Sequence, residues 1–324
     1  MCVISEIYFF GGKMKKIKLG KDGPISPAIA LGCMRFNKKT SHEVKSILKT
    51  AINSNINFFD HADIYGAGYC EEIFGNSFNS LGINRDAIII QSKCGIIKDD
   101  NGTTIRYDFS KKHIISSVKE SIDRLKCDYL DIFALHRPDM LLDPEEIADA
   151  FYSLHKQGLV KYFGVSNQNP NEIDLIQKST SHNLIVNQLQ FGIAHTSMMD
   201  INIYTNKNHT KANLKDGEIL NYCRLNDITI QAWGPLSTSD RSGIFIDNPK
   251  YEELNSKLQL VGNDYNVSKE AMAIAWILRH PANIQVIIGT TQPKRIENIA
   301  EASEINITRN EWYDIYNCAG NILP

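Results

Sequence analysis

The chain has 324 residues, 43% of them hydrophobic and 22% charged, and this ordinary globular composition excludes disordered, collagen-like and fibrous proteins. Its 35 Lys and Arg nearly balance 37 Asp and Glu, so no basic face predicts a nucleic-acid partner. Seven scattered cysteines without a C-x-x-C pair indicate reduced thiols, and the apolar stretches are too short to cross a bilayer, so we expect a cytoplasmic protein without a membrane partner.

The first segment, MCVISEIYFFGGKMKK, has the wrong order of features for a secretory signal. It contains Glu6, and its basic cluster follows the apolar part instead of preceding it. Met14 is an alternative start. We expect residues 1–14 to be a disordered N-terminal extension and residues 15–324 to form one domain.

Short β-branched runs alternate with helix-length amphipathic segments along the rest of the chain. Several runs are apolar throughout, as expected for strands buried on both faces. The expected strands cover residues 29–31, 57–60, 87–92, 129–135, 162–165, 185–189, 229–233 and 284–288. The segment KIKLGKDGPIS before them predicts a hairpin.

The segments between the strands carry helix-start signals. A Thr, Asp or Asn followed three residues later by Glu has the spacing of a capping box. This spacing occurs at Thr40 and Glu43, Asp143 and Glu146, Asn169 and Glu172, and Thr308 and Glu311. Residues 111–126 place their apolar side chains on one helical stripe. The polar stretch 195–216 has no clear period, which predicts an irregular loop, and residues 308–317 predict an extra terminal helix.

Eight strand-then-helix units without a break in composition predict an α/β fold, a single (β/α)8 TIM barrel with an N-terminal hairpin and an extra C-terminal helix. A doubly wound sheet is the alternative. It would carry G-x-G-x-x-G after the first strand, where this sequence reads LGCMRFN, and the chain has no P-loop motif either. The barrel is therefore favoured.

Polar residues stand where three consecutive strands end. NINFFD ends in Asp60 and leads into Tyr65, AIIIQSK ends in Lys93, and YLDIFALH ends in His136. Each alone has an ordinary structural explanation, such as a capping Asp or a packed Tyr. Because the carboxyl ends of barrel strands share one face, the combination predicts one pocket that contains all four side chains.

Other kinds of site are not indicated. The sequence has no H-E-x-x-H and no cysteine–histidine spacing typical of zinc sites, and His61 with Asp63 is only a fragment of a metal motif. A Ser-His-Asp hydrolase would carry a G-x-S-x-G elbow, which is also missing. We expect no metal.

Several motifs together resemble the aldo-keto reductase family. FFDHADIYG resembles the segment with its catalytic Asp and Tyr, IIIQSKCG its lysine strand, and LDIFALHRPD its histidine strand. GLVKYFGVSN, IVNQLQF, QAWGPL and IIGTTQPKRIENI follow in the family's order, so the resemblance runs from about residue 15 to residue 318. The DHADIYG form is most similar to a bacterial single-chain branch.

The resemblance implies an NADPH-dependent oxidoreductase that reduces an aldehyde or ketone, a small-molecule carbonyl substrate, to an alcohol; no oligomeric state is predicted. It implies a catalytic tetrad of Asp60, Tyr65, Lys93 and His136, with NADPH extended across the top of the barrel. The implied cofactor contacts are Gly32, Met34, Asp60, Ser166, Asn167, Gln188, Trp233, Gly234, Leu236, Thr290, Thr291, Arg295 and Asn298.

These contacts divide by role. By the resemblance, Ser166, Asn167 and Gln188 would hold the nicotinamide carboxamide, and Trp233 would stack on the nicotinamide ring. Thr290, Thr291 and Arg295 match the region that holds the adenosine 2′-phosphate. The sequence departs from the family there, since Gly289 stands where a lysine is common and Ile299 where an Asn is common.

The residue chemistry suits carbonyl reduction. A Lys93 ammonium about 4 Å from the phenol is worth roughly 4 kcal/mol to the phenolate at an effective dielectric near 20, so we expect it to lower the pKa of Tyr65 by about three units. Tyr65 would be the general acid, Asp60 would orient Lys93, and neutral His136 would donate to the carbonyl oxygen. Two alternatives stay open, a cofactor-sensing regulatory subunit and a lyase with Lys93 as a Schiff-base lysine.

Overall fold

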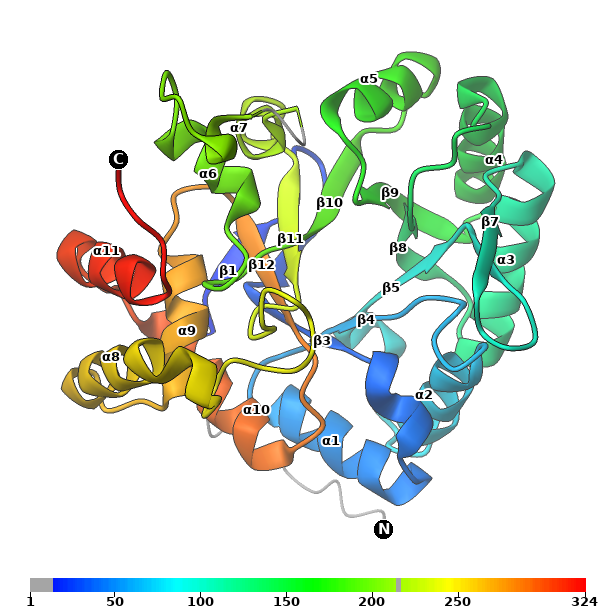
Figure 1. Ribbon diagram of the computed structural model, residues 1–324. Coiled ribbons are helices and arrows are strands. Elements are labelled where there is room, and N and C mark those ends of the chain that lie inside the picture. The colour runs from blue at the N-terminus through cyan, green and yellow to red at the C-terminus, as the bar shows by residue number, and fades with distance from the viewer. Residues whose placement is uncertain (1–13, 214–216) are drawn as a thin grey trace, which may run out of the picture.

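The computed structural model describes residues 14–213 and 217–324. Its centre is a closed barrel of eight parallel strands with helices around it, which confirms the predicted TIM barrel (Figure 1). In spatial order the strands are β10 (Leu184–Gln190), β11 (Thr229–Trp233), β12 (Ile284–Ile288), β3 (Ile29–Gly32), β4 (Phe58–Asp60), β5 (Ile89–Cys94), β8 (Leu130–Leu135) and β9 (Val160–Ser166). Strand β9 pairs with β10 and closes the barrel.

The barrel strands lie at the eight predicted places. Every residue of β3, β4, β5, β8 and β12 is buried, because helices cover the outside of the barrel and side chains fill its inside. The third predicted strand was expected to begin at residue 87. That residue ends a short 3-10 helix, Arg85–Ala87, because the Asn84 side chain accepts a hydrogen bond from the Asp86 N–H.

Helices follow the barrel strands in chain order. They are α1 (Ser41–Asn53), α2 (Tyr69–Asn79), α3 (Lys111–Leu125), α4 (Pro144–Lys156), α5 (Pro170–Ser179), α6 (Ser197–Ile203), α7 (Ile219–Leu225), α8 (Glu252–Asp264), α9 (Lys269–Leu278), α10 (Pro293–Ala300) and the terminal α11 (Arg309–Cys318). The extra C-terminal helix is therefore present as predicted.

Three of the four predicted capping boxes form, at the starts of α1, α5 and α11. The fourth does not form in full. Asp143 caps α4 by accepting from the Glu145 N–H, whereas the Glu146 carboxylate accepts from the backbone N–H of Lys111 at 2.9 Å. Glu146 thus ties α4 to the first turn of α3.

The polar stretch 195–216 contains more structure than predicted. Its first part forms α6, and a 3-10 turn follows at Thr210–Ala212, so the expected irregular loop is wrong for these residues. Helix α6 is stable because Met198, Met199 and Ile201 are buried, and the Tyr204 hydroxyl after it donates to the carbonyl of Ile322. Residues 214–216 lie outside the described residues.

Two hairpins flank the barrel. The predicted N-terminal one pairs β1 (Lys16–Lys18) with β2 (Ile25–Pro27), and a second, β6 (Ile96–Lys98) with β7 (Thr104–Tyr107), follows β5. Of the expected N-terminal extension, residues 1–13 lie outside the described residues, and Met14 is buried.

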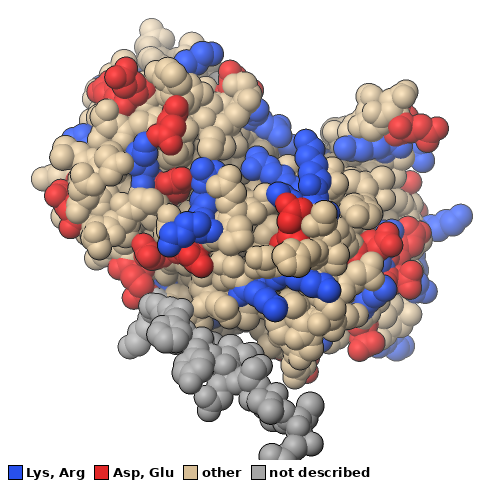
Figure 2. Space-filling model, turned by 90° about the horizontal axis from the view of Figure 1, so that it is seen from below, with Lys and Arg blue, Asp and Glu red and all other residues tan. Residues whose placement is uncertain are grey.

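Basic and acidic side chains are interspersed on the face drawn in Figure 2. None of the helices among residues 14–213 and 217–324 is both long and apolar enough to cross a membrane.

Close packing between neighbouring strands gives the first prediction. A Cβ atom on Gly164 of β9 would overlap Cγ2 of Val186 on β10 and lie 3.0 Å from its carbonyl oxygen. Gly164→Ala should therefore lower the free energy of unfolding by about 1–3 kcal/mol, the usual cost of overpacking. Gly243→Ala, where nothing lies within 4 Å of the added Cβ, is the control. Urea unfolding of the two variants checks this, and equal stabilities would contradict it.

Candidate active site

Four polar side chains meet at the carboxyl ends of β4, β5 and β8. Asp60 is the last residue of β4, Lys93 is next to last in β5, and His136 directly follows β8. Tyr65 lies in the loop between β4 and α2. Register explains the convergence, because β4 pairs with β5 and β5 pairs with β8. The structure therefore brings the predicted group of four together.

The centre of the group is an ion pair inside the barrel. Lys93 Nζ lies 2.5 Å from Asp60 Oδ1, and the two side chains are 0% and 3% exposed. Lys93 Nζ also donates to the carbonyl oxygen of His61 at 2.7 Å. The same ammonium lies 5.4 Å from the centre of the Tyr65 ring, and the Tyr65 and His136 rings meet edge to face with centroids 6.0 Å apart.

A chain of hydrogen-bonded glutamine amides inside the barrel donates to the Asp60 carboxylate. Asp60 Oδ1 accepts from Gln91 Nε2 at 2.8 Å and from Gln188 Nε2 at 2.9 Å. Gln91 and Gln231 exchange two amide hydrogen bonds, at 2.8 and 3.0 Å, and Gln231 Nε2 donates to Gln285 Oε1 at 2.9 Å. Gln285 Nε2 donates to Ser26 Oγ and to the Pro27 carbonyl. All four glutamines are buried.

Sequence reasoning missed three of these glutamines. Gln91, Gln231 and Gln285 each interrupt an apolar strand, in IIIQSK, TIQAW and IQVII. An uncharged polar side chain in a strand buried on both faces needs a hydrogen-bond partner, and this signal was available in the sequence. It could not show that the partners are one another.

The electrostatics correct one expectation. Burial raises the pKa of Tyr65 well above its usual value, and the Asp60 carboxylate raises it further. The predicted lowering of this pKa by Lys93 is therefore wrong in this structure, because burial is the largest effect on the phenol and the Lys93 ammonium hydrogen-bonds to Asp60 and to the His61 carbonyl. Burial, followed by the charges of Lys93 and Arg137, holds the pKa of His136 well below its usual value, so its imidazole is neutral.

The residues implied for the nicotinamide carboxamide are hydrogen-bonded in series. Trp233 Nε1 donates to Asn167 Oδ1 at 3.2 Å, and Asn167 Nδ2 donates to Ser166 Oγ at 2.7 Å. Ser166 Oγ donates to the carbonyl oxygen of Gln188 at 3.0 Å, and Gln188 reaches Asp60. This series joins the ends of β9, β10 and β11 to the group of four.

Two arginines beside Trp233 were not among the predicted site residues. The guanidinium carbons of Arg137 and Arg241 lie 5.9 and 5.0 Å from the centre of its ring. Arg137 directly follows His136, and Arg241 lies in the loop after β11. Gly234 in the same loop has φ +62, a left-handed conformation that glycine adopts without strain, and Leu236 two residues on is half-buried.

The remaining predicted cofactor residues follow β3 and β12, which are neighbours in the barrel. Gly32 ends β3 and Met34 begins the 3-10 helix after it. Thr290 and Thr291 follow β12, and Arg295 and Asn298 lie on α10. Arg295 Nε lies 3.2 Å from Glu270 Oε1. Arg35, which was not predicted, donates to the carbonyl oxygen of Gly289 at 3.2 Å.

The glutamine chain predicts a measurable contribution to stability. Gln91→Leu removes a hydrogen-bond donor from the buried Asp60 carboxylate. It also removes the Gln91 partner from both the oxygen and the nitrogen of the Gln231 side-chain amide. We expect a loss of about 1–3 kcal/mol in the free energy of unfolding. Gln157→Leu is the control, because the Gln157 side chain is exposed and its hydrogen bonds within the described residues go to Ser153. A Gln91→Leu protein as stable as the control would contradict a structural role for the chain.

Comparison with known proteins places the chain in a family. Among curated relatives, the uncharacterized oxidoreductase YcsN of Bacillus subtilis is 31% identical and the alignment covers 94% of this chain and 97% of YcsN. A 6-dehydroglucose reductase of Agrobacterium fabrum is 30% identical, with 93% of this chain and 91% of that protein covered.

A solved structure agrees with the fold. The thermostable aldo-keto reductase Tm1743, in complex with the inhibitor epalrestat, aligns with a TM-score of 0.74 over 94% of this chain and 100% of its own, at 21% sequence identity. The sequence model of the aldo/keto reductase family matches residues 28–319, nearly the whole described barrel. The chain therefore belongs to the aldo/keto reductase family of oxidoreductases.

Proposed function

We propose that this protein reduces an aldehyde or ketone to an alcohol with NADPH, and that Asp60, Tyr65, Lys93 and His136 carry the reaction. The observation that carries the proposal is the buried Lys93–Asp60 pair beneath the Tyr65 ring, with His136 beside that ring. An amine that donates to Asp60 and to a backbone carbonyl is not a free nucleophile, which disfavours the Schiff-base alternative.

Tyr65 is the proton donor. Its raised pKa means that the phenol keeps its proton at neutral pH. The reduced carbonyl becomes an alkoxide, whose conjugate acid is about as weak an acid as water. Because a phenol is ordinarily a much stronger acid than an alcohol, an alkoxide is a suitable acceptor for the Tyr65 proton. The Lys93 ammonium, 5.4 Å from the ring centre, stabilises the phenolate that remains.

His136 and Asp60 position the reacting groups. A neutral imidazole keeps one N–H, which can donate to the substrate carbonyl. Such a donor stabilises charge that develops on the oxygen. Asp60 holds the Lys93 ammonium in place, and the amides of Gln91 and Gln188 hold Asp60.

The residues around Trp233 fit a nicotinamide. Gln188 Nε2 donates inward to Asp60 and to Gln231, which leaves Oε1 of Gln188 to accept from a carboxamide N–H. Asn167 and Ser166 supply further amide and hydroxyl groups, and the Trp233 indole supplies a flat apolar face. NADPH, when bound there, supplies the hydride.

The ends of β12 and β3 fit a 2′-phosphate. The Nε atom of Arg295 forms an ion pair with Glu270, and the guanidinium has further N–H donors for a phosphate. Thr290 and Thr291 add hydroxyl groups. Gly289 lacks the family's common lysine, but the Arg35 guanidinium lies against the Gly289 carbonyl and brings a positive charge to the same place.

Tyr65→Phe tests the general acid. We expect carbonyl reduction to fall by at least 100-fold, the size of a general-acid contribution, while NADPH affinity stays within a few-fold. Tyr152→Phe, with Tyr152 59% exposed on α4, is the control. Activity is followed by NADPH oxidation with a panel of aldehydes, ketones and sugar aldehydes, since two relatives are named 6-dehydroglucose reductase. Turnover like that of the native enzyme in Tyr65→Phe would rule out the assignment.

Cofactor preference tests the phosphate contacts. One charge-assisted hydrogen bond from Arg295 is worth roughly 1.5–3 kcal/mol, so we expect NADPH to bind about 10- to 100-fold more tightly than NADH. Arg295→Ala should remove most of this preference, whereas Lys294→Ala, an exposed neighbour on α10, should keep it. Equilibrium titration of both cofactors measures the ratio, and equal dissociation constants in the unmutated protein would contradict the proposal.

A further inference from the structure

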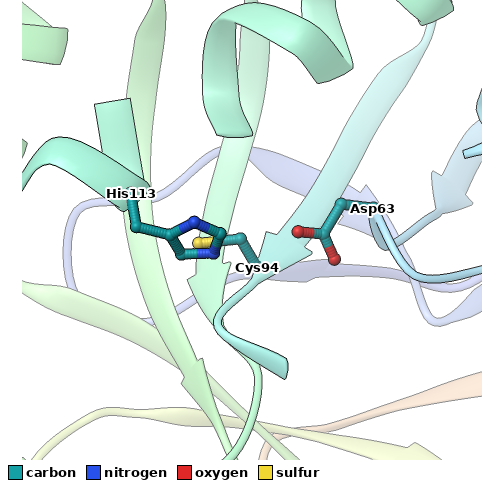
Figure 3. Close-up of side chains that lie close together, drawn as sticks. All are labelled: Asp63, Cys94 and His113. Carbon is teal, nitrogen blue, oxygen red and sulfur yellow. The ribbon is translucent and has the colours of Figure 1, made fainter. Parts of the chain in front are cut away.

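Three side chains with metal-binding atoms meet on the outer side of β5, away from the pocket. Asp63 comes from the loop after β4, Cys94 ends β5, and His113 lies in the first turn of α3. Their carboxylate, thiol and imidazole atoms all lie within 4.8 Å of one another, and in the view of Figure 3 the Cys94 thiol overlaps the His113 imidazole while the Asp63 carboxylate lies beside both. Neighbouring residues of a strand point to opposite faces, so Lys93 faces the barrel interior and Cys94 faces α3.

One oxygen of the buried Asp63 carboxylate lacks a hydrogen-bond partner. Its Oδ1 is buried and has no hydrogen bond among the described residues, and none of the ion pairs within residues 14–213 and 217–324 includes Asp63. Burial, with the nearby Glu71 carboxylate, raises the pKa of Asp63 to about 7, although a hydrogen bond from the Ile64 N–H and the charge of Arg124 oppose this shift. A buried carboxylate oxygen without a partner is costly, and a bound cation would relieve that cost.

The set of donors selects the kind of cation. A thiolate, an imidazole and a carboxylate are ligands of Zn²⁺ and similar ions, whereas Mg²⁺ and Ca²⁺ prefer oxygen alone. Zn²⁺ holds such ligands at about 2.0–2.3 Å, so small side-chain rotations would close the cluster around one ion. Ser117 Oγ, 3.3 Å from His113 Nε2, orients the imidazole.

We propose that Asp63, Cys94 and His113 form a binding site for one Zn²⁺-like divalent ion, with a fourth position open to water. The site is separate from the carbonyl-reducing pocket and independent of the function proposed for it. It is nevertheless linked to that pocket through the chain, because Asp63 lies between Asp60 and Tyr65, and the Asp63 N–H donates to the Lys93 carbonyl at 3.0 Å. A bound ion would take the place of the Cys94 thiol proton, which would leave to solvent.

Titration of the full-length, reduced protein with Co²⁺ tests the proposal. Co²⁺ bound to a thiolate gives a charge-transfer absorption that oxygen-only sites do not give. We expect one equivalent per chain, displaced by Zn²⁺. His113→Gln and Asp63→Asn should each weaken binding at least 10-fold, and Cys94→Ala should abolish the charge-transfer band.

Matched variants control for other thiols and imidazoles. Cys223→Ala replaces another buried cysteine, and His42→Gln replaces an exposed histidine on α1. Both should bind Co²⁺ like the native protein. His113 is only half-buried, so His113→Gln keeps the test valid if Cys94→Ala does not fold. Absence of the thiolate band, or binding that His113→Gln and Asp63→Asn leave unchanged, would overturn the proposal.

Discussion

Two opposite charges inside the barrel, on Lys93 and Asp60, impose requirements on the residues around them. A buried charge without a partner costs several kcal/mol, and even a pair is stable only when further hydrogen bonds satisfy both groups. Here the backbone of His61 serves the ammonium, and the amides of Gln91 and Gln188 serve the carboxylate. The glutamines in turn need partners of their own, and this need extends the polar chain across the barrel to Ser26.

The same ion pair shapes the chemistry of the pocket. Because Asp60 and the His61 carbonyl accept the hydrogen bonds of Lys93, the ammonium influences Tyr65 through its electric field and not through a hydrogen bond. Burial then dominates, and both aromatic groups at the pocket stay neutral, Tyr65 as a phenol and His136 as an imidazole. A pocket with two neutral donors above one compensated charge is suited to a substrate that becomes negative only during reaction.

Because neighbouring side chains of a strand point to opposite faces, the end of β5 contributes residues both to the pocket and to the outer side of the barrel. Lys93 points into the barrel and Cys94 points toward α3, although they are adjacent in the chain. The loop after β4 behaves in a similar way, since it supplies Tyr65 to the pocket and Asp63 to the outer cluster (Figure 3). A ligand on the outside of β5 would therefore act on the same backbone that holds the residues of the pocket.

How well each feature can be predicted from the sequence depends on whether the interaction that forms it is local or joins residues far apart in the chain. Alternating apolar runs and capping residues are local signals, so the eight strands, the barrel and three of the four capping boxes were predictable. The motifs around Asp60, Tyr65, Lys93 and His136 are local as well, and they indicated both the family and the pocket. Features set by distant partners were not predictable. Glu146 bonds to Lys111 instead of closing its own capping box. Helix α6 forms because its apolar side chains are buried and the segment after it is hydrogen-bonded to the C-terminal residues. The Tyr65 pKa rises because burial and the Asp60 charge disfavour the phenolate. The Asp63, Cys94 and His113 cluster has no spacing motif, because three segments meet there only once β4, β5 and α3 have packed.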